Sequence, residues 1–153
     1  MTGWIAGAVM IQALAMLVDE GWCHRRRGLP RWERIGHPLD TLTMALCYGW
    51  LAFTQPTTAH AIAIYAGLAR FSCLFITKDE FVHAKRCTAI EMWLHAVLFV
   101  VHPIVLIAFG LAWWWGAPAW LFGLQLGITL AFASYQVLYW SQHEHSQADR
   151  DRQ

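Results

Sequence analysis

The sequence predicts an all-α fold, an integral membrane bundle of five transmembrane helices, and its composition is the first observation behind that prediction. Of the 153 residues, 58% are hydrophobic and 14% are charged, whereas roughly a quarter of the residues in soluble domains are charged. Apart from Arg70, the charged side chains occupy only the stretches 19–40, 78–91 and 144–152. So little polar surface favours a lipid environment over water.

Five apolar segments are the second observation. A bilayer core about 30 Å thick needs roughly 20 apolar residues of helix to cross it. The second segment is the shortest, and to span it must extend through Thr54 or lie in thinned lipid. The predicted spans cover residues 2–18, 39–53, 58–76, 89–114 and 119–140; they form one domain at 1–141, followed by a polar cytoplasmic tail at 142–153.

Turn-forming residues separate these spans. Glycine and proline interrupt helices, and a proline also disfavours helical backbone at the residue before it. The predicted turns are Gly28-Leu29-Pro30 and Gly36-His37-Pro38 in the first connection, Gln55-Pro56 in the second, and Gly116-Ala117-Pro118 in the fourth.

Basic residues in the connections predict which way the helices run. The first connection contains five arginines and the third contains Lys78, Lys85 and Arg86, while the second and fourth contain no charge. Loops rich in lysine and arginine stay on the cytoplasmic side of a membrane. The sequence therefore predicts an outside N-terminus and a cytoplasmic C-terminus, in a bacterial-type inner or plasma membrane.

Carboxylates and histidines gather at the cytoplasmic ends of the predicted spans. They form four pairs whose members are three or four residues apart, the spacing that places two side chains on one face of a helix. His143 and His145 fall at the same level, and Asp19 and Asp79 are reserves. The eight candidate metal ligands are Glu20 and His24, His37 and Asp40, Glu80 and His83, and Glu91 and His95.

Imidazole and carboxylate groups from several helices are the usual ligands of a first-row transition metal. In ferritin-like di-iron proteins, Glu-x-x-His pairs and further glutamates project into a helix bundle. The segment Glu80-Phe81-Val82-His83 has this spacing, so the ligand types and their number resemble that pattern, without the HxxxH and HxxHH boxes of membrane desaturases. The resemblance implies a transition-metal cofactor, with two iron ions as one option and zinc or manganese as others.

Helix capping is a competing explanation for three of the acidic residues. Thr77-x-x-Glu80 and Thr88-x-x-Glu91 have the capping-box spacing. Pro38 at a first helical position would put Asp40 in a first turn, where an acid is favourable. Capping does not account for the histidine that follows Glu80 or Glu91 by one turn. A structural polar layer and a metal site therefore both stay open.

Two polar residues lie deeper in the predicted membrane. Arg70 is expected to pair with Asp40 or Glu91, because an unpaired arginine there is costly. His102, followed by Pro103, is expected to be a hydrogen-bonded interior histidine at a proline kink. Haem is disfavoured as a cofactor because His60 is the only other histidine on the predicted outer side.

Three functions are open from the sequence. The first is a metal-dependent membrane oxidoreductase, hydroxylase- or desaturase-like, that acts on a lipid-soluble substrate or a quinol. The second is a metal-ion or proton-coupled transporter or channel, although polar residues thin out towards the outer side. The third is a structural or assembly subunit of a membrane complex or homo-oligomer. Membrane lipid is the expected partner. A nucleic-acid partner is not expected, because a net charge of +1 does not indicate the basic face that such binding needs.

Overall fold

The computed structural model describes residues 2–80 and 87–150, and throughout these ranges the chain is helical apart from short connections, with no strand. The elements are α1 (Thr2–Val18), η1 (Asp19–His24), α2 (Arg25–Arg27), α3 (Arg31–Phe53), α4 (Ala59–Phe75), η2 (Ile76–Asp79), α6 (Ala89–Trp114) and α7 (Ala119–Arg150). The element η1 is a π-helix and η2 is a 3₁₀-helix. The predicted all-helical class is confirmed.

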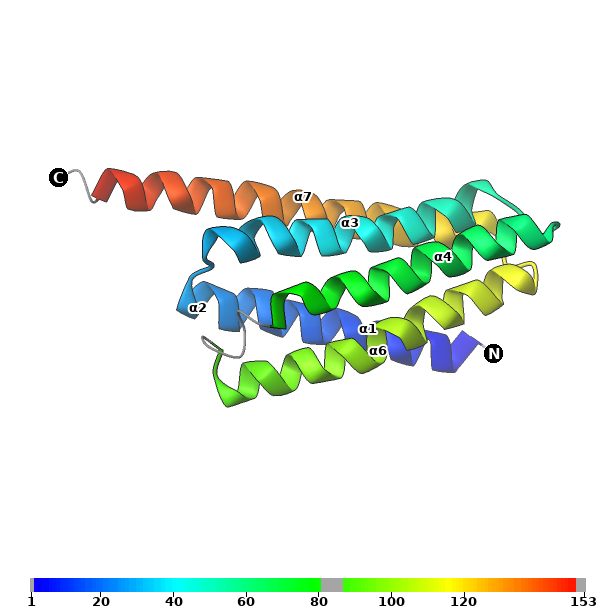
Figure 1. Ribbon diagram of the computed structural model, residues 1–153, viewed down its shortest axis with the longest axis horizontal. Helices are drawn as coiled ribbons and strands as arrows, with labels where there is room; N and C mark the ends of the chain where they lie inside the picture. The colour runs from blue at the N-terminus through cyan, green and yellow to red at the C-terminus, as the bar shows by residue number, and fades with distance from the viewer. Residues whose placement is uncertain (1, 81–86, 151–153) are drawn as a thin grey trace.

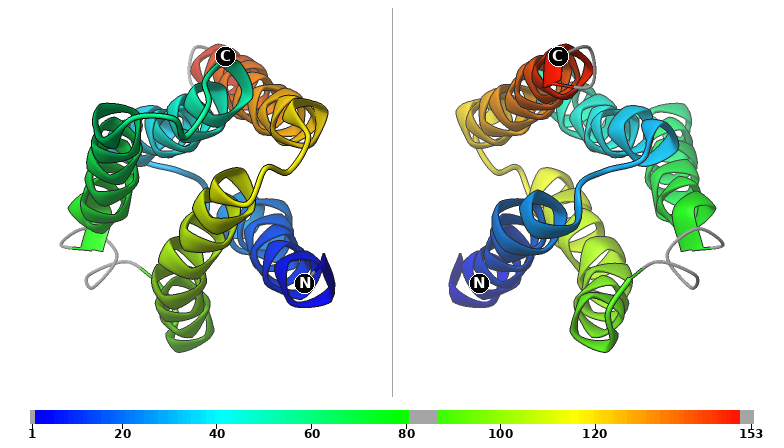
Figure 2. Two further views of the ribbon diagram at one scale, coloured as in Figure 1. Left: turned by 90° about the vertical axis from the view of Figure 1, so that its right-hand side faces the viewer. Right: turned by 90° about the vertical axis from the view of Figure 1, so that its left-hand side faces the viewer.

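The five long helices run alternately up and down in one bundle (Figure 1). Seen from either end, α3 lies between α4 and α7, and α1 lies beside α6 (Figure 2). The segments η1, α2 and η2 all lie at the same end as the C-terminus. We call this the charged end, because Arg25, Arg26 and Lys78 lie there.

Four helical segments are long and apolar enough to cross a membrane: Ile5–His24, Ala59–Lys78, Ala89–Trp114 and Ala119–Gln142. They correspond to the first, third, fourth and fifth predicted spans. The second predicted span lies in α3, which is 23 residues long but carries Arg31, Glu33 and Arg34 in its first turns. Its crossing of a membrane stays a prediction, as does the inside-outside orientation. Helix α7 continues past its predicted end at Trp140 to Arg150.

The predicted turn at Gly36-His37-Pro38 is wrong, because α3 runs through it without a break and has Pro38 inside the helix. A proline lacks the amide hydrogen of a helical bond and usually ends or kinks a helix. Here Gly36 and Pro38 are both buried in the bundle, and the packing of α3 against α7 and α4 outweighs the local preference. The helix therefore begins two turns earlier than expected and brings Glu33 one turn before His37. Asp40 is consequently not in a first turn, as the capping interpretation supposed.

A closely packed apolar core fills the half of the bundle away from the charged end. The ring of Tyr48 meets the ring of Phe109 edge-on, with centroids 5.0 Å apart. The hydroxyl of Tyr65 donates a hydrogen bond to the Leu106 carbonyl at 2.5 Å. The buried members of this core include Tyr48, Leu51, Val105, Leu106, Phe109 and Phe122. Apolar and aromatic packing therefore holds this half of the bundle together.

Gly110 of α6 packs against the ring of Tyr65 of α4 with no room for a side chain. A Cβ atom added there would lie 2.5 Å from Cε1 of the Tyr65 ring, and that ring is held by its hydrogen bond to Leu106 and by Trp113, whose ring centroid is 6.0 Å away. We expect Gly110→Ala to lower the free energy of unfolding by about 1–3 kcal/mol, the usual cost of overpacking. The measurement is thermal unfolding in detergent, with Gly123→Ala as control because nothing lies within 4 Å of a Cβ there. Equal melting temperatures of the two variants would contradict this packing.

Candidate metal centre

The π-helical segment η1 brings three polar side chains onto one face. A π-helix has i to i+5 hydrogen bonds. Asp19, five residues before His24, therefore lies beside it, and so does Glu20, four residues before it. The Nε2 atom of His24 is 3.3 Å from Oδ2 of Asp19, and its Nδ1 atom is 3.3 Å from Oε2 of Glu20. All three residues are buried. The predicted pairing of Glu20 with His24 is therefore present, and Asp19 joins it because the turn is wider than an α-helical one.

Helix α6 supplies the other half of a first group of ligand atoms. The Thr88 hydroxyl caps the helix by accepting a hydrogen bond from the Glu91 amide at 3.3 Å. Glu91 Oε1 lies 3.8 Å from His24 Nε2, and His95 Nε2 lies 3.2 Å from Asp19 Oδ1. One ligand atom from each of Asp19, His24, Glu91 and His95 lies within 4.8 Å of the others. Glu91 thus belongs both to a helix start and to this group.

Helix α3 contributes a second group that shares His24 with the first. One ligand atom from each of His24, Glu33 and His37 again lies within 4.8 Å of the others. The His24 and His37 rings are 4.6 Å apart between centroids, and Glu33 is fully buried. We call the two groups together the His/carboxylate cluster; its members are Asp19, His24, Glu33, His37, Glu91 and His95.

Glu20 orients the shared histidine. Its Oε1 atom accepts a hydrogen bond from Trp140 Nε1 at 2.6 Å, while Oε2 faces His24 Nδ1 at 3.3 Å. A carboxylate on one imidazole nitrogen directs the proton there and leaves the other nitrogen as the ligand atom. The Nε2 atom of His24 faces the carboxylates of Asp19 and Glu91, at 3.3 Å and 3.8 Å.

The indole of Trp140 is expected to set metal affinity through Glu20. In Trp140→Phe the ring remains but the hydrogen bond to Glu20 is lost, so His24 is less firmly oriented. Loss of such an indirect partner typically lowers metal affinity about 10–100-fold. Competition with a chromophoric chelator measures this, with Trp32→Phe as the matched control because Trp32 is exposed on α3. An affinity unchanged in Trp140→Phe would contradict the role of Glu20.

The structure brings together five of the eight predicted ligands: Glu20, His24, His37, Glu91 and His95. Asp40 lies on the cavity described below but pairs with Lys78, whose Nζ donates to both carboxylate oxygens at 2.7 Å. Glu80 follows η2 and belongs to neither group, and His83 lies outside the described residues. Two members of the cluster were not among the eight predicted ligands: Glu33 was not predicted, and Asp19 was named only as a further candidate. The signals that could have found them are the Glu33-x-x-x-His37 spacing and the adjacent acids Asp19 and Glu20.

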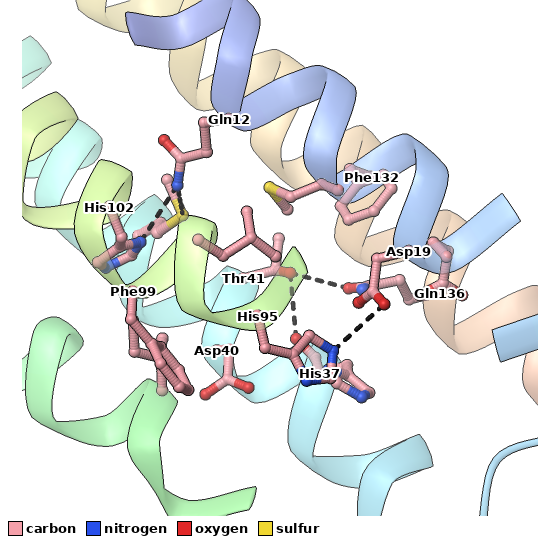
Figure 3. Close-up of a pocket in the computed structure, with 15 residues that line it drawn as sticks. Gln12, Asp19, His37, Asp40, Thr41, His95, Phe99, His102, Phe132 and Gln136 are labelled. Carbon is pink, nitrogen blue, oxygen red and sulfur yellow. Dashed lines mark hydrogen bonds and ion pairs between the residues drawn. The ribbon is translucent and has the colours of Figure 1, made fainter. Parts of the chain in front are cut away.

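A cavity of about 100 Å³ runs from the cluster into the middle of the bundle. Figure 3 shows Asp19, His37 and His95 at one end of it and Gln12 and His102 at the other. Its walls between these polar ends include the apolar side chains of Met16, Met44, Ile76, Leu98, Phe99 and Phe132. The cavity can therefore admit an apolar group to the side of the cluster that faces the membrane interior.

His102 closes the far end of the cavity within a chain of hydrogen bonds. Its Nδ1 atom lies 3.2 Å from Gln12 Nε2, and its Nε2 atom lies 3.0 Å from Ser72 Oγ. Ser72 is hydrogen-bonded in turn to Thr43 at 2.8 Å. Because Gln12 donates from nitrogen, Nδ1 of His102 is the acceptor and Nε2 donates to Ser72. This is the hydrogen-bonded interior histidine that the sequence favoured over a haem ligand.

Comparison of the chain with protein-family models, with curated proteins and with solved structures gives no match. The fold and the site by themselves define a membrane-spanning helical protein with a buried His/carboxylate group that could hold a metal ion.

Proposed function

We propose that the His/carboxylate cluster is a transition-metal site and that the protein is a membrane oxidoreductase acting on a lipid-soluble substrate. The observation that carries the proposal is the convergence of Asp19, His24, Glu91 and His95 from η1 and α6 within 4.8 Å, with all four residues buried. Side chains 67 or more residues apart in the sequence meet here, so local helix capping cannot explain the arrangement.

The charge of the cluster supports a cation. Buried carboxylates are costly unless they are paired or coordinate a metal. Among the cations of the charged end, Arg25 donates to the Tyr135 hydroxyl at 2.8 Å, Arg26 stacks on Trp22, and Lys78 pairs with Asp40. A divalent ion held by Asp19, Glu91 and the histidines would offset the carboxylate charge directly.

The ligand set favours iron among the first-row metals. The first group offers two imidazoles and two carboxylates, and the second offers two imidazoles and one carboxylate. Two histidines with one carboxylate is the set that non-haem iron oxygenases use, and mixed carboxylate-histidine sets hold di-iron centres in helix bundles. Iron bound in this way supplies oxygen activation. The protein's own contribution is to orient His24 through Glu20 and to present a cavity with both polar and apolar walls beside the cluster.

The cavity also supports catalysis over transport. It ends at Gln12 and His102, and beyond them lies the packed core around Tyr48, Leu106 and Phe109. A carrier would have to open that core to release its cargo, since channels and carriers line their routes with polar groups. A cavity that joins the cluster to apolar walls instead suits a lipid-soluble substrate.

Oxygen uptake tests the proposed activity. Protein loaded with ferrous iron and placed in lipid nanodiscs should oxidise two molecules of decylubiquinol, a lipid-soluble two-electron donor, to the quinone for each dioxygen reduced to two molecules of water. Glu91→Gln should lose this uptake, whereas Glu80→Gln should keep it, because Glu80 belongs to neither group of ligand atoms. Uptake by wild type no faster than by Glu91→Gln, with iron bound in both, would overturn the oxidoreductase proposal for this donor class.

A further inference from the structure

A second hollow lies on the outside of the bundle, between α3 and α7 at the charged end. It has a volume of about 530 Å³, and none of the residues that line it belongs to the His/carboxylate cluster. Two arginines of α3, Arg31 and Arg34, line it together with the apolar side chains of Ile35, Leu39 and Leu42 and with Val137 of α7. We call this hollow the arginine groove.

Helical periodicity explains why charge and apolar surface meet in this groove. Residues three, four, seven and eight positions apart share one face of an α-helix. Arg31, Arg34, Ile35, Leu39 and Leu42 follow that spacing, so the face begins with two cations and continues with three aliphatic side chains. Glu33 and His37 lie on a different face of α3, within the cluster. The groove therefore has a basic head and an apolar stem.

The stem of the groove is open towards the surroundings of the bundle. Ile35 is 53% exposed, Leu39 42%, Leu42 41% and Val137 53%. The neighbouring segment of α7 is part of a helix long and apolar enough to span a membrane. With the α7 segment in a membrane, an aliphatic surface at the end of that span would continue the lipid-facing surface, and the arginines beside it would lie at the level of the headgroups.

We propose that the arginine groove binds one anionic phospholipid from the surrounding leaflet. The phosphodiester lies between the guanidinium groups of Arg31 and Arg34, which suit phosphate oxygens through charge-assisted, forked hydrogen bonds. One acyl chain lies along Ile35, Leu39, Leu42 and Val137. Charge complementarity selects an anionic headgroup over a zwitterionic one, and the length of the apolar stem selects a lipid over a free phosphate.

The groove shares a wall with the metal centre. Trp140 lines the groove and also donates its indole hydrogen to Glu20, which faces His24. The lipid site nevertheless stands independently of the proposed activity, because it rests on Arg31, Arg34 and the aliphatic stem alone.

Native mass spectrometry of the purified chain tests the site. The protein is incubated with equal amounts of phosphatidylglycerol and phosphatidylcholine in detergent, and the retained lipid is counted. Wild type should retain phosphatidylglycerol, and Arg31→Gln with Arg34→Gln should weaken its binding by about fivefold for each arginine and about thirtyfold together. The matched control is Arg25→Gln with Arg26→Gln, which removes the same charge from side chains that contact Tyr135 and Trp22 instead.

A second variant keeps both arginines and blocks the stem. Leu42→Trp places an indole in the groove and should also reduce retention of phosphatidylglycerol, with helix content and monodispersity unchanged. Equal loss in the groove and control variants would overturn the proposal, because it would mean general attraction to a basic end. Full retention in both groove variants would do the same. Displacement of the lipid by inorganic phosphate alone would identify an anion site and exclude the acyl-chain stem.

Discussion

Alanine in place of His24 is expected to remove bound metal from the protein. This histidine is the residue that the two groups of ligand atoms share, and its Nε2 atom lies within 3.8 Å of both Asp19 and Glu91. Replacing a residue that is hydrogen-bonded to a metal ligand already lowers metal affinity about 10–100-fold. Loss of the shared ligand itself should therefore lower affinity by more than about 100-fold, which elemental analysis of the purified variant would record as a near-complete loss of metal.

The matched control for this experiment is His60→Ala. His60 is exposed at the start of α4, at the end of the bundle opposite the charged end. Its replacement should leave metal content at the wild-type value. Wild-type metal content in a folded His24→Ala variant would contradict the assignment of His24, whereas equal loss in both variants would point to a general effect of removing histidine.

Methionine in place of Lys78 is expected to destabilise the charged end. Lys78 Nζ contacts both oxygens of Asp40 at 2.7 Å, and the side chains are only 17% and 16% exposed. Removing one member of a largely buried ion pair leaves the other charge poorly compensated and typically costs about 3 kcal/mol or more. The unfolding midpoint in mixed detergent should therefore fall in Lys78→Met and should not fall in Arg26→Met, whose charge is at the surface.

A charge-free double variant separates the ion pair from other effects of the substitution. Asp40→Asn combined with Lys78→Met removes both charges and should recover most of the stability lost by Lys78→Met alone, which a double-mutant cycle would quantify. A double variant no more stable than Lys78→Met would show that Lys78 acts through other contacts, such as its position over the Phe75 ring.

The sequence predicted most of the helices because the lipid core leaves little choice of structure. Inside hydrocarbon every backbone amide must be bonded within the chain, so a long apolar run is a helix. The helix over 89–114 begins and ends where predicted, whereas the helix over 2–18 begins where predicted but continues without a break through η1 and α2 to Arg27. The end of α3 at Phe53 was predicted, but its start was wrong because its first turns are polar and are followed by Pro38, and there the packing of the bundle decides.

Regular helical spacing and bundle packing also explain which site residues the sequence could reveal. The pairs Glu20 with His24 and Glu91 with His95 have α-helical spacing and were predicted. Asp19 comes into reach only because η1 is a π-helix, a local change that the spacing of residues does not announce. Glu33 was overlooked because the expected turn before Pro38 placed it in a loop. Asp40 is a carboxylate at the depth of the cluster, but it pairs with Lys78. That pairing depends on where α4 ends, because Lys78 lies in η2 directly after it.

X-ray absorption spectroscopy at the edge of the bound metal tests the central claim most directly. If the His/carboxylate cluster holds the metal, the spectrum of the wild-type protein should show only nitrogen and oxygen ligands at about 2.0–2.2 Å, with the multiple scattering of at least two imidazoles. His95→Ala should lose that imidazole signal in part or lose the metal altogether. A spectrum dominated by sulfur at about 2.3 Å, or a folded wild-type protein that takes up no transition metal, would contradict the account.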